Sequence, residues 1–159
     1  MQEQQLLNQM IALSQKKLEM LEELRILTEK QHQAFLNKAL DDIEKILSQK
    51  DETIEYIQKL DNAFLGVSEN LKGLLGISSL EALSDTSLDG RLQLKEVIKE
   101  ITGVVESVIQ LEQESFKYAA DMKSELGEKI KGINAGKRMT TAYSIKPITS
   151  PSYFFDKKK

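Results

Sequence analysis

The most constraining feature of this sequence is a long run, Leu40–Leu75, in which apolar side chains recur every three or four positions. This spacing is the repeat of one face of an α-helix, and only Lys50 interrupts it. The run contains no proline, and Asp41 and Glu44 stand at the spacing of a capping box at its start. We therefore expect one uninterrupted helix, about 54 Å long, whose apolar face needs partners along its whole length. The apolar positions are Leu40, Ile43, Leu47, Ile54, Ile57, Leu60, Phe64, Val67, Leu71 and Leu74.

Two further segments are suited to cover that face. Residues 2–36 carry two adjacent apolar rows, and residues 91 to about 132 keep the three–four rhythm from Leu94 to Leu126. Between the second and third segments lies a linker rich in Ser and Asp, in which Leu80–Leu83 could form one short helical turn. The first row is Leu6, Met10, Leu13, Met20, Leu24 and Leu27, and beside it lie Leu7, Ile11, Leu18, Leu21 and Phe35.

The last residues differ in character from the rest. Gly132, Asn134 and Gly136 are typical of a helix end, and both prolines of the chain follow them. Three consecutive aromatic residues, Tyr153–Phe155, would be an aggregation risk if they had no partner. The fold class that we predict is all-α, a long antiparallel three-helix bundle or coiled coil over residues 1–133. An extended, mobile tail over residues 134–159 is expected to follow it.

Charge and composition exclude several classes of protein. Six basic residues and one acidic residue give positions 134–159 a charge of +5, so the total of −3 leaves −8 on the remainder. An acidic body argues against a nucleic-acid surface, which needs a basic stripe. No apolar run is long enough to cross a membrane, the first residues do not resemble a signal peptide, and cysteine is absent. These features predict a protein without membrane insertion or disulfides.

The sequence offers little catalytic chemistry. With one histidine and no cysteine, the usual nucleophile–base pairs and metal sites cannot be assembled, and no glycine-rich phosphate loop is present. We therefore expect no enzyme activity and no cofactor. His32 could in principle be a phosphorelay histidine, although a lone histidine between Gln31 and Gln33 is more often solvated.

Two stretches resemble a known family. The run from Lys38 to Leu60, with its Lys50-Asp51-Glu52 group near the middle of a long helix, is similar to the core pattern of the FlgN family of flagellar export chaperones. The end of the chain is similar too, where Tyr143, Ser150-Pro151 and Phe154-Phe155-Asp156-Lys157 follow one another. The resemblance spans nearly the whole chain in length and in the order of elements.

The resemblance implies a cytoplasmic chaperone for the hook-associated proteins of the bacterial flagellum. Such a chaperone binds the amphipathic C-terminal helices of these clients, prevents their premature assembly and delivers them to the export gate. It also implies that the last helix and the tail bind the client and that Tyr143 docks to the cytoplasmic domain of the export gate. The residues expected to bind the client are Tyr118, Met122, Leu126, Ile130, Ile133, Tyr153, Phe154 and Phe155.

Other readings of the sequence stay open. A second assembly factor of the secretion apparatus, such as a filament-cap chaperone or an ATPase-associated coiled coil, would share the same helical pattern. A structural coiled coil that self-associates through its apolar rows would share it as well. The identity of the client and the oligomeric state do not follow from the sequence.

Overall fold

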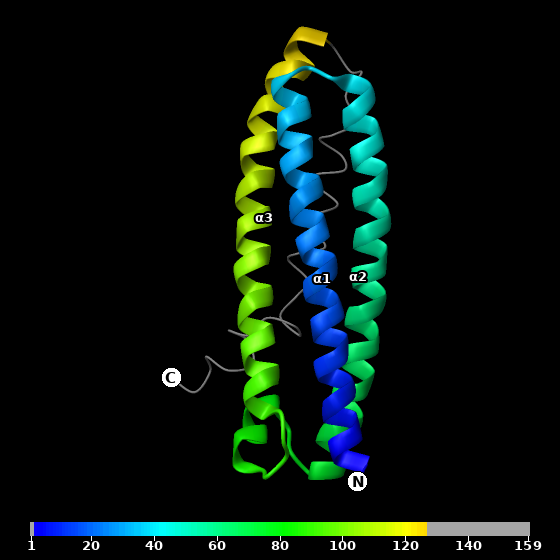
Figure 1. The fold of residues 1–159 in the computed structure, drawn as a ribbon, viewed down its shortest axis with the longest axis vertical. Coiled ribbons are helices and arrows are strands. Elements are labelled where there is room, and N and C mark those ends of the chain that lie inside the picture. Colours follow the sequence, from blue (N-terminus) through cyan, green and yellow to red (C-terminus); the bar gives the residue numbers. More distant parts are fainter. Residues whose placement is uncertain (1, 127–159) are drawn as a thin grey trace.

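The computed structural model describes residues 2–126, with side chains described as far as Asp121. Three long helices run antiparallel to one another: α1 (Gln2–Leu36), α2 (Leu40–Leu75) and α3 (Arg91–Leu126) (Figure 1). A 3-10 helix, η1 (Leu80–Asp85), lies in the connection between α2 and α3. The described chain is therefore an all-α bundle without strands, which confirms the predicted class. The predicted tail, residues 134–159, lies outside the described residues.

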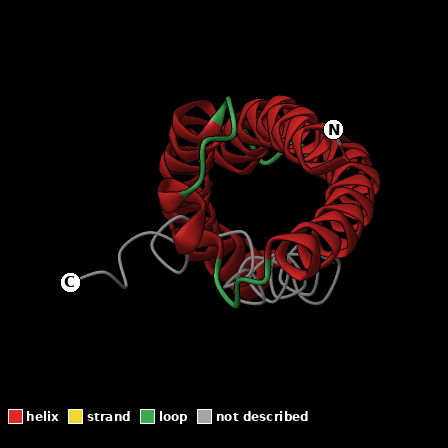
Figure 2. Ribbon diagram, turned by 90° about the horizontal axis from the view of Figure 1, so that it is seen from below, coloured by secondary structure: helices red, strands yellow, loops and turns green. Residues whose placement is uncertain are grey.

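Helix α1 is the central element of the bundle. It packs along both α2 and α3, whereas α2 and α3 come close to one another at very few points. In Figure 1, α1 accordingly lies between the other two helices. Seen along the long axis in Figure 2, the helices lie around that axis rather than in one flat layer. Helices α2 and α3 therefore meet mainly through side chains that extend into the interior.

The connection from α1 to α2 is short and is built differently from our expectation. Ala39 occupies the N-cap position of α2 and makes no side-chain capping bond, so the capping box predicted from Asp41 and Glu44 is wrong. Instead, Lys38 adopts a left-handed conformation (φ 54°), and the N–H of Ala39 donates to the carbonyl of Ala34 over 2.9 Å. The turn is therefore closed by backbone hydrogen bonds, as at many helix C-termini.

The far end of α2 is closed by glycine. Gly76 is left-handed (φ 66°), and the N–H of Ile77 donates to the carbonyl of Lys72 over 3.0 Å, the bond of a Schellman motif. Beyond it, the hydroxyl of Ser79 accepts a bond from the N–H of Glu81 and so caps η1. These two local hydrogen-bonded structures end α2 and begin η1 in the connection to α3.

One row of buried positions in α1 follows a strict seven-residue repeat. Along this row, pairs of apolar residues alternate with pairs of polar residues. The row also differs from the row of apolar residues that the sequence favoured. Leu6, Leu13, Met20 and Leu27 are only partly buried, whereas Ser14, Lys17, Thr28 and Gln31 are buried. A sustained seven-residue repeat is the pattern of supercoiled helices. The buried row of α1 is Leu7, Met10, Ser14, Lys17, Leu21, Leu24, Thr28, Gln31 and Phe35.

The interior is divided into three apolar clusters along the bundle. The lower cluster, near the N-terminus in Figure 1, includes Leu7, Met10, Phe64, Leu71, Leu80, Leu94 and Ile98. The middle cluster includes Leu21, Leu24, Ile54, Ile57, Val97, Ile101 and Val108. The upper cluster is Ala34, Phe35, Ile43, Ile46, Leu47 and Ala119. Buried polar residues separate these clusters, so the core is not continuous.

Candidate functional site

The upper polar layer, defined here as Gln31, Lys50 and Glu112, takes one residue from each helix. The ammonium of Lys50 donates to the amide oxygen of Gln31 and forms an ion pair with the carboxylate of Glu112. The side chains of Lys50 and Glu112 are only 1% and 4% exposed. The pair spans α2 and α3, the two helices with few direct contacts, and so connects them across the interior.

Burial determines the electrostatics of this layer. Removal from water lowers the pKa of the Lys50 ammonium, because burial penalises its charged form, and the nearby carboxylate of Glu112 opposes this shift. A buried ion pair of this kind is weak evidence for net stability, since the desolvation penalty of two charges can exceed their attraction. Its stronger effect is to disfavour any arrangement of the helices that separates Lys50 from Glu112.

The lower polar layer, defined here as Ser14, Lys17 and Asp61, joins α1 to α2. The Nζ atom of Lys17 lies 2.7 Å from Oδ1 of Asp61, and the two side chains are 5% and 13% exposed. Burial lowers the pKa of the Lys17 ammonium to about 7. The carboxylate of Asp61 opposes this shift, because an opposite charge at this distance favours the charged form of the lysine.

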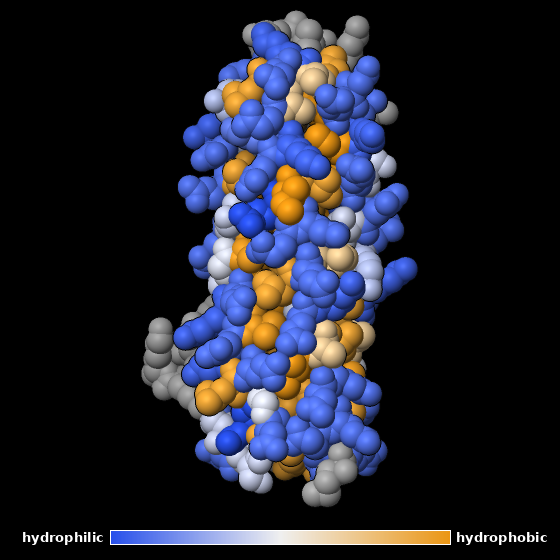
Figure 3. All heavy atoms as spheres, viewed as in Figure 1, coloured by the Kyte–Doolittle hydropathy of each residue, from blue (hydrophilic) through white to orange (hydrophobic). Residues whose placement is uncertain are grey.

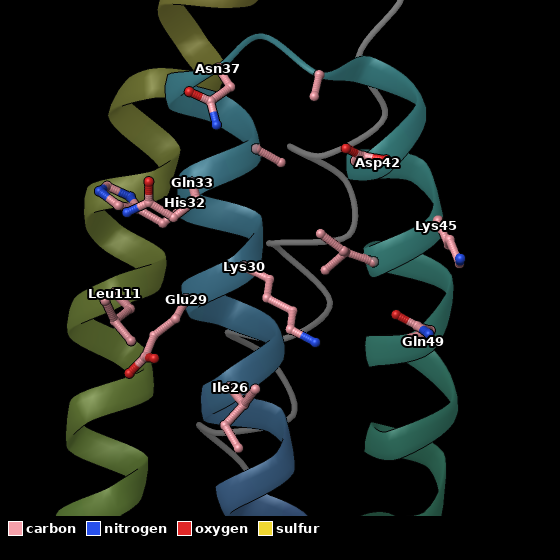
Figure 4. A pocket seen from close by; sticks show the side chains of 13 residues that line it. Ile26, Glu29, Lys30, His32, Gln33, Asn37, Asp42, Lys45, Gln49 and Leu111 are labelled. Carbon is pink, nitrogen blue, oxygen red and sulfur yellow. The ribbon is translucent and has the colours of Figure 1, made fainter.

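His32 follows Gln31 of the upper polar layer in α1 and contacts α3. Its Nδ1 atom is 3.4 Å from the hydroxyl of Ser115, and its ring meets the ring of Tyr118 edge to face, with centroids 5.2 Å apart. Figure 4 shows the imidazole directed toward α3. His32 is therefore part of the α1–α3 contact rather than fully solvated, as the sequence had suggested. A structural role of this kind is a simpler account of the residue than phosphate transfer.

A surface groove lies at the same end of the bundle. It encloses about 930 Å³ and is lined mainly by α1 and by the start of α2, with His32 and Leu111 on the side toward α3 (Figure 4). Ala34 and Ile46 are buried members of the lining, whereas Lys30, Asp42 and other polar members are exposed. Ile26 is an exposed apolar member. The groove thus combines an apolar base with a polar rim, as binding sites for amphipathic segments do.

The face of the bundle seen in Figure 3 carries an interrupted seam of apolar surface between charged side chains. Over the described residues, the large apolar side chains with the greatest exposure are distributed over all three helices. They are Ile26, Leu36, Tyr56, Leu74, Leu92 and Tyr118. Of these, Leu74 belongs to the apolar row predicted for α2, and its exposure corrects that prediction at the end of the helix.

Most residues predicted to bind a client fall outside the part of the chain whose side chains the structure describes. Tyr118 is the exception: it is 39% exposed and packs against His32, on the α1–α3 side of the bundle. Met122 and Leu126 lie in α3, beyond the described side chains. Ile130, Ile133, Tyr143, Tyr153, Phe154 and Phe155 lie outside the described residues, so their assigned roles remain predictions.

Sequence reasoning missed both buried ion pairs. One signal for them was present: Lys50 occupies an inward position of an otherwise apolar row, and Lys17 lies seven residues from both Met10 and Leu24. A charged residue at such a position calls for a partner of opposite charge on a neighbouring helix. Nothing in the sequence, however, identifies Asp61 and Glu112 among 25 acidic residues as those partners.

Two further features are absent from residues 2–126. No group of three or more His, Asp or Glu side chains is arranged to hold a metal ion there. Within the same residues, no helix combines the length and apolarity that crossing a membrane requires.

The fold and its polar layers define the structural class of the protein: a long antiparallel three-helix bundle with buried ion pairs. Comparison with protein-family models gives no match for the chain, and comparisons with curated proteins and with solved structures give none either. Functional inference therefore depends on the geometry of the bundle and on the sequence resemblance described above.

Proposed function

We propose that the protein binds amphipathic helices of partner proteins. The observation that carries this proposal is the groove at the α1–α2 end, which joins buried Ala34 and Ile46 to a rim of charged and amide side chains. Such a groove suits a helix with one apolar stripe and polar flanks. Because Lys30, Asp42 and Lys45 place charges of both signs on the rim, a partner with both signs beside its stripe fits best.

The sequence resemblance to the FlgN family supports a more specific proposal. The partners would be the C-terminal helices of hook-associated proteins, held apart until the chaperone delivers them to the cytoplasmic domain of the export gate. A self-associating coiled coil is the alternative, since its partner helices would come from further copies of the same chain.

Size-exclusion chromatography with light scattering tests the proposal. The protein is run alone and then mixed with the C-terminal segment of a hook-associated protein. We expect a complex of defined stoichiometry, weakened at least about tenfold by Ile26→Glu in the groove, a change of about 1.4 kcal/mol in binding free energy. Leu92→Glu is the matched control, because Leu92 is also an exposed apolar residue but lies at the other end of the bundle. A discrete oligomer that ignores the client would instead favour the coiled coil.

The roles assigned to the last residues have tests of their own. Deleting residues 134–159 should leave the helical content and the unfolding midpoint of the bundle unchanged but weaken client capture. Undiminished client affinity in the truncated protein would contradict that assignment.

A separate substitution tests the role of Tyr143. Tyr143→Ala should spare client binding and weaken binding to the export-gate domain, since tyrosine provides large contact area at small entropic cost. Loss of client binding with intact gate binding would reverse the assignment.

A further inference from the structure

The inner face of α3 changes character at Glu112. Between Arg91 and Val108 its buried residues are all apolar: Leu94, Val97, Ile98, Ile101 and Val108. From Glu112 onward, the buried residues of the described part are Glu112, Ser115 and Ala119. The fully buried side chains of α3 are therefore large and apolar along its first half, and they are polar or small from Glu112 to Asp121, where the described side chains end.

The contacts of the second half reflect this change. Glu112 pairs with Lys50, the hydroxyl of Ser115 lies 3.4 Å from His32, and the ring of Tyr118 meets the same histidine. Ala119 is the one α3 residue of the upper cluster among the described residues. A polar contact replaces hydrogen bonds to water and so adds little net stability, whereas the burial of apolar surface is the main source of folding stability. Residues 112–121 of α3 are thus held much less firmly by their described contacts than residues 91–108.

We infer that α3 consists of two units with their boundary at Glu112. The lower unit, residues 91–108, opens only when the whole bundle unfolds. The upper unit, residues 112–121, opens locally while α1, α2 and the lower unit stay folded, as weakly packed segments of proteins do. Opening uncovers the α1–α2 end of the bundle, where Phe35 and Ile43 belong to the cluster that Ala119 completes. This inference does not depend on the proposed function.

Single cysteines can measure the two units separately, because the chain contains no cysteine of its own. Ser115→Cys probes the upper unit, and Val108→Cys is the matched control in the lower unit, since both native side chains are at most 1% exposed on the inner face of α3. Both variants are treated with a thiol-reactive disulfide reagent under native conditions. We expect the thiol at position 115 to react at least about tenfold faster than the thiol at position 108.

The dependence on urea separates local from global opening. At position 115 the reaction should accelerate only slightly in low urea, because local opening exposes little surface, whereas at position 108 it should follow global unfolding. Equal rates with equal dependence on urea at both positions would overturn the inference. Hydrogen exchange on the unmodified protein provides the same comparison without substitutions, with faster exchange expected over residues 112–121 than over residues 94–108.

Ordinary fraying of a helix end must be distinguished from a unit whose boundary is set by the upper polar layer. Replacing the ion pair by apolar residues, Lys50→Met with Glu112→Leu, should slow the reaction at position 115 several-fold, because the boundary then joins the apolar interior. Fraying from the end of α3 would leave that rate unchanged, and an unchanged rate would overturn the inference. The double substitution should change the reaction rate at position 108 only by the amount that the change in global stability accounts for.

Discussion

The lower polar layer leads to a sharp prediction about pH. Substituting Asp61→Asn removes the negative charge 2.7 Å from the ammonium of Lys17 while keeping the shape of the side chain. Burial lowers the pKa of Lys17 in the native protein from 10.5 to about 7, and without the carboxylate the pKa of Lys17 in the variant should be lower still. Each unit of such a shift corresponds to about 1.4 kcal/mol, so carrying the lysine into the folded state costs at most about 5 kcal/mol at pH 7. We expect a measured loss of about 3–5 kcal/mol.

The sign of the pH dependence follows from proton linkage. In the variant the folded chain releases the proton of Lys17 at or below about pH 7, whereas the unfolded chain keeps it up to about pH 10.5. Between these values the unfolded state binds the extra proton, so stability rises with pH by up to about 1.4 kcal/mol per unit. The cost of the buried lysine, measured against a variant that lacks it, should therefore shrink steadily as the pH rises above about 7.

Urea denaturation followed by circular dichroism, at pH values from 6 to about 10, measures this effect. The control is the double variant Lys17→Met with Asp61→Asn, which contains the same asparagine but lacks the titrating group. Subtracting the two curves cancels the titration of every other lysine. A difference that does not change with pH would refute the reasoning, because it would mean that Lys17 stays charged, or reaches water, in the folded variant.

Three further predictions concern stability and use the same denaturation assay. Lys50→Met alone should cost about 3–5 kcal/mol by leaving Glu112 buried without its ammonium partner, whereas adding Glu112→Leu should recover most of that loss; additive losses would contradict the pairing. Gly90→Ala should cost about 1–3 kcal/mol, because Gly90 has φ +97° and an added Cβ would lie 2.7 Å from Cδ1 of Ile11. Gly66→Ala should instead stabilise by about 0.4–1 kcal/mol, since the site is helical and an added Cβ there meets no atom within 4 Å; destabilisation would show that the open face of α2 is already in use.

The helical architecture could be predicted well from the sequence, because the signals that start and end its helices lie in nearby residues. The absence of proline before Pro147 predicts long uninterrupted helices, and Gly76 and Gly90 mark the observed end of α2 and the observed start of α3. The short helical turn expected around Leu80–Leu83 is likewise present, as η1. These features depend on nearby residues only, which is why a single sequence suffices to find them.

The inward face of α1 could not be predicted in the same way. Apolar content favoured the row through Leu13 and Met20, but the strict seven-residue repeat buries Ser14 and Lys17 instead. That preference arises from partners distant in sequence, since Asp61 and Glu112 compensate the buried lysines. Charge compensation across helices is a tertiary property and leaves no local pattern. The client-binding residues predicted near the end of the chain lie mostly beyond the described side chains, so their roles still await the binding experiments proposed above.

The triad of the upper polar layer also constrains the order in which a newly made chain can mature. Helices α1 and α2 leave the ribosome first, and their hairpin already brings Gln31 near Lys50. The carboxylate of Glu112 lies 62 residues beyond Lys50, and at synthesis rates of about 5–20 residues per second it follows only several seconds later. During that interval the ammonium of Lys50 keeps its water, because nothing else in the hairpin neutralises it within the triad. The upper end of the nascent α1–α2 hairpin thus stays hydrated, and Lys50 loses its water only when α3 packs against the hairpin.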